Sequence, residues 1–277
     1  MPEIELSSGT VDFLDTGGTG PVVVLTGGLI IGGSLWRHVV GLLEPEYRCL
    51  VPTLPLGAHR HPMRADVRLT PYSVAMLLGE FLDRLDLREV TLVENDTGRA
   101  QTLAGERPDR LARLVLASCE AFDNYPPGLP GRLIAVAARM PGGIGMLVQP
   151  MRLRALRRLP IAYGWMAKRP IPHSDTDDWL RPVLSDRAIR TDLSRYLRSC
   201  TRHDMTDAAE KLAGFTRPVL VVWAGDDKVM PLAHARRLVD LVPDGRLVEI
   251  PDSYTLIAHD QPAALATAID SFVRATS

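Results

Sequence analysis

The stretch "VTLVENDTGRAQTLA", residues 90–104, decides the expected fold. It starts as an apolar run typical of a buried strand, breaks at Asn95-Asp96-Thr97-Gly98, and resumes with the spacing of a helix. A strand that turns directly into a helix is the unit from which parallel sheets are built. The stretch therefore predicts an α/β fold, and it raises the question of why an aspartate occupies the turn.

The same alternation of strand and helix continues on both sides of this stretch. The chain opens with a hairpin-like segment over 4–18, and strand-like and amphipathic segments then follow in turn. Strands are expected at 21–28, 47–55, 89–96, 111–120, 217–227 and 245–252, and helices at 34–43, 70–87, 98–108, 231–243 and 261–276. With the two hairpin strands, this predicts an eight-stranded, mostly parallel sheet with helices on both faces.

The alternation stops between 121 and 216, where the chain becomes rich in proline and arginine. Short helical pieces such as "RLIAVAARM" and "DLSRYLRSC" replace it. We expect this segment to form a helical cap on a core made of 1–120 and 217–277. Because such sheets bind ligands beyond the carboxyl ends of their strands, the pocket should lie under that cap.

Composition argues against several classes of protein. The 277 residues carry a formal net charge of −1, which gives no reason to expect a nucleic-acid partner. The N-terminal sequence does not resemble a signal peptide and no apolar run is long enough to span a bilayer, so we expect a cytoplasmic protein. The cysteines Cys49, Cys119 and Cys200 are too widely spaced for a disulfide framework or a zinc site. We expect neither a metal nor a cofactor.

The order of these elements resembles the α/β-hydrolase family, and more closely its aspartate-nucleophile branch, the epoxide hydrolases and haloalkane dehalogenases. In that family the nucleophile lies on a strained turn between strand and helix, flanked by small residues. Asp96 takes its position and Gly98 is the small residue after it, whereas Glu94 and Arg99 replace residues that are usually small. The resemblance implies that Asp96 forms an alkyl ester with its substrate. An ordinary turn with a helix cap is the alternative.

The segment "LTGGLIIGGSLW" stands where the family commonly has His-Gly-x-Pro, although the histidine has become Thr26 and the proline Leu29. By position, the resemblance implies an oxyanion hole formed by the backbone N–H groups of Gly28 and Thr97. It also leaves Trp36 as a candidate substrate contact. A plain glycine-rich turn is the alternative. Haloalkane dehalogenases place a tryptophan directly after the nucleophile, so Thr97 argues against dehalogenation.

Two further carboxylates are candidates for the site. The segment "VVWAGDDKVMP" matches the family loop that carries the catalytic acid, which aligns with Asp227, while Asp226 is its outward neighbour. Glu120 ends the preceding strand, where some family members carry their acid instead. We expect Asp96, Glu120 and Asp227 to face one pocket together with Gly28 and Thr97. Like charges in a partly dry site raise at least one carboxyl pKa, which would provide a proton donor near neutral pH. A solvated acidic loop is the alternative at Asp227.

The family's catalytic histidine is missing. The segment "VEIPDSYTLIAHDQP" aligns without gaps on the family pattern, and the position of that histidine is Thr255, which cannot act as a general base near neutral pH. His259 is a candidate replacement, with a surface or helix-start role as the alternative. His173 and His203 lie in the cap segment. The combination of "NDTG" with "SYTL" is similar to a subgroup of bacterial α/β-hydrolase-like proteins.

The cap should choose the substrate, because cap helices form the pocket roof in this family. Epoxide hydrolases use cap tyrosines to protonate the epoxide oxygen, which makes Tyr163, Tyr196 and Tyr125 candidates. Simple packing of these rings is the alternative. The segment "MRLRALRRLP" is expected to be a solvated lid face, with attraction of an anionic substrate or a membrane surface as a second interpretation.

Three functions remain open. The first is an epoxide-hydrolase-like enzyme for a small, largely apolar molecule, with Asp96 as nucleophile and a non-standard or missing base. The second is acid–base chemistry, such as isomerisation, elimination or ring closure, by Asp96, Glu120 and Asp227. The third is ligand binding without catalysis. A pure binding pocket has little use for buried carboxylates, which favours chemistry. The expected partner is a small-molecule substrate, without stable membrane insertion, and a homodimer stays open.

Overall fold

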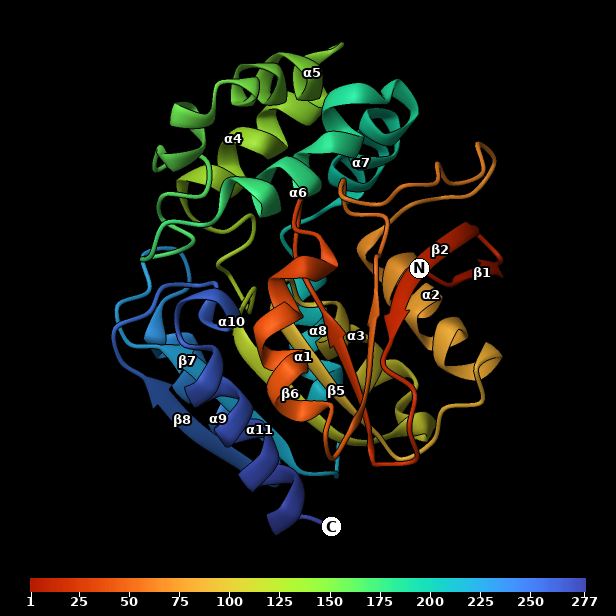
Figure 1. The fold of residues 1–277 in the computed structure, drawn as a ribbon, viewed down its shortest axis with the longest axis vertical. Helices are drawn as coiled ribbons and strands as arrows, with labels where there is room; N and C mark the ends of the chain where they lie inside the picture. Colours follow the sequence, from red (N-terminus) through yellow and green to blue (C-terminus); the bar gives the residue numbers. More distant parts are fainter.

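A computed structural model describes residues 1–277, and its centre is one eight-stranded sheet (Figure 1). The strand order is β1-β2-β4-β3-β5-β6-β7-β8. The first hairpin pairs antiparallel with β4, and β3 to β8 run parallel to one another. The strands are β1 Glu3–Leu6, β2 Gly9–Asp15, β3 Val22–Thr26, β4 Arg48–Pro52, β5 Val90–Asp96, β6 Leu111–Cys119, β7 Val219–Ala224 and β8 Gly245–Ile250. The eight-stranded, mostly parallel sheet expected from the sequence is confirmed.

Helices cover both faces of this sheet, as buried parallel strands require. Figure 1 shows α1 and α11 in front of the sheet and α3 and α8 behind it. Helix α2 packs on α3, and α9 packs on β7 and β8. These helices are α1 Arg37–Leu43, α2 Pro71–Arg84, α3 Arg99–Glu106, α8 Asp204–Leu212, α9 Leu232–Leu241, α10 Ile257–Asp260 and α11 Pro262–Ala275, with 3-10 turns at Gly33–Trp36 and Pro108–Arg110.

The start of α2 shows how local sequence sets an element. Thr70 and Ser73 each accept a backbone N–H from the other, which forms a capping box, and Pro71 occupies the first helical position. The apolar residues of α2 then face the core. Most buried hydrophobic side chains, 80 in number, form one continuous cluster that joins the sheet to its helices and to the cap.

Between β6 and β7 the chain forms helices only. Figure 1 shows α4 to α7 gathered above the sheet as a separate layer. These helices are α4 Gly128–Arg139, α5 Gly143–Val148, α6 His173–Ser185 and α7 Arg187–Ser199, with 3-10 turns at Gln149–Arg152 and Arg154–Arg158. Helix α8, which follows them, packs against α3 beside the sheet. The cap boundaries at 121 and 216 therefore remain a prediction. None of the helices combines the length and apolar character needed to cross a bilayer.

Candidate active site

The turn after β5 holds Asp96 in a strained backbone conformation. Its φ is 77°, in the left-handed region that residues with a side chain rarely adopt. The side chain is buried, with 6% of the residue exposed. Asn95, directly before it, donates from its amide to the carbonyls of Ala117, Ser118 and Thr255. The asparagine therefore ties the end of β5 to the end of β6 and to the loop after β8, which holds the turn in place.

The loop after β3 presents one backbone donor to Asp96. The N–H of Leu29 donates to Oδ2 of Asp96 at 3.2 Å. Gly28 lies so close that a Cβ there would be 1.7 Å from the same oxygen, so only glycine fits. The N–H of Thr97 donates instead to the Asn95 carbonyl at 3.1 Å. The expected donor pair of Gly28 and Thr97 is therefore not the one that contacts Asp96. The N–H group that does so belongs to the residue after Gly28, which is Leu29.

Glu94 and Arg99, the two departures from the family's small residues, form part of one buried charge cluster. Glu94 accepts hydrogen bonds from the Thr97 hydroxyl at 2.9 Å and from the backbone N–H groups of Arg99 and Ala100 at 2.6 and 2.8 Å. A carboxylate at this place satisfies the free N–H groups at the start of α3. Arg99 is fully buried and pairs with Glu120 at 3.3 Å. The large residues therefore replace close backbone packing with ion pairing and capping.

Three carboxyl groups are buried around the elbow, and burial is the largest cause of the raised pKa of each. Burial raises the pKa of Glu94 to about 7, although Arg99 and the helix N–H groups oppose the rise. Burial, with a smaller contribution from Asp227, raises the pKa of Asp96 to about 7. The pKa of Glu120 rises to about 8, because burial and the charges of Asp96 and Glu94 outweigh Arg99. Glu120 is therefore the group that holds its proton to the highest pH.

The loops after β7 and β8 bring Asp227 and Thr255 together. Oδ1 of Asp227 accepts the Thr255 hydroxyl at 2.8 Å and the N–H groups of Val229 and Met230 at 2.9 and 2.8 Å. Its other oxygen is buried without a partner. Burial raises the pKa of Asp227 above its usual range. Thr255 thus occupies the place beside the acid where the family carries its histidine, and it offers a hydroxyl in place of a base.

No histidine lines the cavity beside Asp96. His259 lies in the short helix α10, half-buried, beside the backbone carbonyls of Arg169 and Pro170, and its burial lowers its pKa. His173 starts α6 and His203 precedes α8, and both are exposed. The structure therefore brings none of the three candidate histidines to the site. It also contains no group of three His, Cys, Asp or Glu side chains arranged to hold a metal ion.

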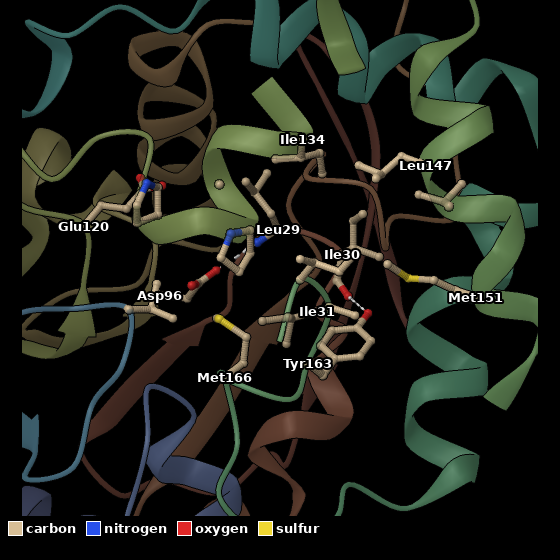
Figure 2. Close-up of a pocket in the computed structure, with 17 residues that line it drawn as sticks. Leu29, Ile30, Ile31, Asp96, Glu120, Ile134, Leu147, Met151, Tyr163 and Met166 are labelled. Carbon is tan, nitrogen blue, oxygen red and sulfur yellow. Dashed lines mark hydrogen bonds between the residues drawn. The ribbon is translucent and has the colours of Figure 1, made fainter. Parts of the chain in front are cut away.

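A cavity of about 90 Å³ lies between the elbow and the cap. Twelve of its 17 lining residues are hydrophobic, and Asp96 and Glu120 are the only carboxyl groups among them. Figure 2 shows these two on one side of the cavity, with the apolar cap residues Ile134, Leu147 and Met151 opposite. The arrangement suits an apolar molecule that meets two carboxyl groups at one end.

Several residues expected at this cavity do not line it. Gly28, Thr97 and Asp227 are not among its lining residues, although Gly28 lies against Asp96. Trp36 is fully buried in the core with its ring nitrogen near Gly27. Tyr196 lies against Arg99 instead, at 5.8 Å from its guanidinium. The expectation of one pocket lined by five site residues was therefore wrong for three of them.

The cap tyrosines also differ from expectation. Tyr163 does line the cavity, but its hydroxyl donates to the Ile30 carbonyl at 2.8 Å, as Figure 2 shows. Tyr125 lines a neighbouring hollow and not this one. No cap tyrosine therefore has a free hydroxyl at Asp96. The functional residue that sequence reasoning missed is Leu29, and its only signal was its place after two glycines. From the sequence, Arg99 was recognised only as a departure from the small residue of the family pattern. Its positive charge was the signal for a buried carboxylate partner, which is Glu120.

Comparisons with known proteins show the family of this chain. The sequence profile described as "Alpha/beta hydrolase family" matches residues 22–268. A haloalkane dehalogenase of Mesorhizobium japonicum is 28% identical over 146 residues, which are 50% of this chain and 47% of that protein. Haloalkane dehalogenase 2 of Mycobacterium bovis is 26% identical over 280 residues, covering 95% of this chain and 91% of the relative.

The likeness extends to solved structures. A crystal structure of a putative ancestral haloalkane dehalogenase superposes with a TM-score of 0.79 at 20% identity, covering 100% of this chain and 99% of that one. At this identity the superposition shows the fold alone. The family profile covers residues 22–268, which is most of the sequence, and the observed strand order is that of an eight-stranded, mostly parallel sheet. The chain therefore belongs to the alpha/beta hydrolase family.

Proposed function

We propose that Asp96 is a nucleophile that forms an ester with small, largely apolar epoxides, and that the protein lacks the base needed to cleave this ester quickly. One observation carries the proposal: a buried carboxylate on a strained turn borders an apolar cavity and accepts the N–H of Leu29. The hydrogen bond holds Oδ2, and Oδ1 accepts no hydrogen bond. An oxygen without a donor, at the edge of an apolar cavity, is well placed to attack carbon.

Glu120 is the proposed proton donor. The attack of Oδ1 on a ring carbon breaks the carbon–oxygen bond of the epoxide, and the oxygen that leaves must take up a proton. Glu120 lines the same cavity, and its pKa of about 8 leaves it protonated near neutral pH. The carboxylate that remains after proton transfer is paired with Arg99. The product is a hydroxyalkyl ester on Asp96, and the proton of its new hydroxyl group comes from Glu120.

The second half of the reaction has no evident base. Hydrolysis of the ester needs an activated water, and a hydroxyl at position 255 cannot take a proton near neutral pH. Asp227 retains its place and accepts a hydrogen bond from Thr255. The relatives named haloalkane dehalogenases support a carboxylate nucleophile in this chain. We therefore infer fast alkylation followed by slow ester cleavage.

Intact-mass measurement tests this proposal. Incubation with a small epoxide should add the mass of one epoxide molecule to the unmodified protein, and the adduct should persist. Asp96→Asn, which has nearly the same shape and no nucleophilic carboxylate, should give no adduct. An adduct that forms equally in Asp96→Asn would refute the assignment of the nucleophile, and repeated turnover without any adduct would refute the absence of a base.

Comparison of two electrophiles tests the role of Glu120. An epoxide needs a proton on its leaving oxygen, whereas an alkyl bromide releases bromide without one. Glu120→Gln should therefore slow alkylation by the epoxide by about 10²-fold to 10⁴-fold and leave alkylation by the bromide nearly unchanged. Equal slowing of both reactions would mean that Glu120 only supports the structure of the site.

Acid–base chemistry without a covalent intermediate is the second candidate. The observation in its favour is that two carboxyl groups with pKa values of about 7 and 8 border one cavity. This function predicts no adduct with any epoxide or alkyl bromide. It also predicts exchange of solvent deuterium into a bound substrate, with loss of exchange in both Asp96→Asn and Glu120→Gln. Ligand binding with neither adduct nor exchange would leave a binding function.

A further inference from the structure

A second hollow adjoins the cavity of Asp96. It has a volume of about 360 Å³ and lies between α4, the end of α7 and the turn after β6. We call it the side chamber. Five residues line both spaces: Leu29, Glu120, Pro127, Gly131 and Ile134. The two spaces therefore share one wall, and Glu120 is part of it.

The side chamber contains polar groups that have no partner within the protein. Tyr125 lines it, is only 8% exposed, and its hydroxyl has no hydrogen-bond partner. A buried hydroxyl left unpaired costs free energy, so a ligand or a water molecule is expected to bind it. The tyrosine of the main cavity differs, because the hydroxyl of Tyr163 is already bonded to the Ile30 carbonyl.

The charge of the side chamber is positive. Arg139 and Arg202 line it, and neither forms an ion pair with a carboxylate. Arg139 donates from Nη1 to the Ala135 carbonyl at 2.8 Å, which leaves its other nitrogens free. The only carboxyl group in the lining is Glu120, and Arg99 already pairs with it. An anion that enters the side chamber therefore meets two guanidinium groups and no competing free carboxylate.

Helix α4 gives the scale of the arrangement. Gly131 borders both spaces, and Arg139 follows eight residues later on the same helix. A helix rises by about 1.5 Å per residue, so the two positions are about 12 Å apart along its axis. Helix α4 therefore runs from the wall shared by the two spaces to the arginine in the side chamber.

We propose that the side chamber binds the carboxylate end of an elongated, otherwise apolar substrate, whose other end lies at Asp96. Arg139 and Arg202 provide the charge, and the hydroxyl of Tyr125 provides a buried hydrogen-bond donor along the way. The assignment of the reactive end rests on the proposed function of Asp96. The recognition of the carboxylate does not.

Titration calorimetry with octanoate and octanol tests the recognition. Neither probe alkylates a protein, so this measurement is independent of the nucleophile. Octanoate should bind the unmodified protein about tenfold more tightly than octanol. The double substitution of Arg139→Gln and Arg202→Gln should remove that preference and leave octanol binding unchanged. Tyr125→Phe should weaken octanoate binding by about threefold without loss of the folded state.

Arg132→Gln is the matched control. Arg132 lies on the same helix, is exposed, lines neither space and has no ion pair or hydrogen bond. Its substitution removes the same charge from α4 and should not change the preference for octanoate. Equal binding of octanoate and octanol to the unmodified protein would overturn the proposal. An equal loss of preference in Arg132→Gln would overturn it too, because the effect would then be one of general surface charge.

Two epoxides that differ only in a carboxylate test both proposals together. Their results show which of the two proposals fails. At low concentration, Asp96 should be alkylated about tenfold faster by 7,8-epoxyoctanoate than by 1,2-epoxyoctane, which lacks the carboxylate. The double arginine substitution should abolish this difference. Octanoate preference in calorimetry without any adduct would refute the nucleophile and leave the side chamber intact. An adduct without octanoate preference would do the reverse.

Discussion

The elbow after β5 and the loop after β8 belong to one candidate site, yet their sequences have departed from the family pattern in different ways. At the elbow, Glu94 and Arg99 replace small residues and form new contacts that cap α3 and pair with Glu120. At the loop, Thr255 replaces the histidine and retains its contact with Asp227. The departures at the elbow thus form buried contacts of their own, whereas Thr255 contacts the acid without offering a base.

The reason that the loop can keep its shape lies in Asp260. This buried aspartate accepts the backbone N–H groups of Tyr254, Lys168 and Arg169, which fixes the loop to the cap segment. Residue 255 contributes one side-chain bond to this arrangement. The position of the loop therefore depends little on which residue occupies position 255. A new base could be introduced there without a change in the rest of the loop. At the elbow, charge and geometry cannot be separated in this way.

The largest effect is expected for Thr255→His. The imidazole would take the place beside Asp227 and activate a water, so cleavage of the ester on Asp96 should accelerate by about 10²-fold to 10⁴-fold. Intact-mass decay of the adduct after removal of the epoxide measures this rate. His259→Gln is the control, and it should leave the decay of the unmodified protein unchanged. If the adduct of Thr255→His decays no faster than that of the unmodified protein although the variant folds stably, the loop lacks more than the histidine.

Arg99→Met should cause the largest loss of stability. The substitution leaves Glu94 and Glu120 buried without their cation, which costs about 3–5 kcal/mol in the free energy of unfolding. Urea unfolding followed by circular dichroism measures it. Arg107→Met is the control, because Arg107 forms only an exposed pair with Asp83, worth about 0–1 kcal/mol. Similar losses in both variants would contradict the claim that the elbow depends on its buried charge.

The rate of adduct formation should depend on pH with two limbs. The nucleophile is the ionised form of Asp96, so the rate should fall as pH drops below its pKa of about 7. With an epoxide, the rate should also fall as pH rises above about 8, because Glu120 then loses the proton that it donates. An alkyl bromide should show the first limb only. A second limb with the bromide would contradict the donor role of Glu120.

The smallest effect is expected for Thr255→Val. The hydroxyl of Thr255 provides one of three donors to Oδ1 of Asp227, and its loss should cost about 1 kcal/mol of unfolding free energy. Thr255→Ser should retain most of it. A loss several times larger, measured in urea, would show that the loop depends on residue 255 and would remove the contrast with the elbow.

The fold could be predicted from the sequence because each element carried a local signal. The apolar runs of strands such as β7 and the capped start of α2 each depend on neighbouring residues only. The alignment also placed Thr255 next to Asp227, and the two are hydrogen-bonded. Such predictions need the order of residues and no knowledge of how distant segments pack.

The details of the site could not be predicted in the same way. Which N–H points at Asp96 depends on the orientation of one peptide plane, so Leu29 could not be told from Gly28. The contacts of Arg99 depend on Glu120, which is distant in sequence and joins it only through the pairing of β5 with β6. Tyr125, Tyr163 and Tyr196 belong to the cap segment, and their directions follow from how cap and core pack together.

The contact between Thr255 and Asp227 has a consequence for stoichiometry. A catalyst with the family's histidine is regenerated, so a small number of copies can clear any quantity of substrate. A chain that esterifies Asp96 and cleaves the ester only slowly is occupied after a single event. The quantity of electrophile that is removed then equals the number of chains present. The supply of new protein, and not turnover, limits this quantity.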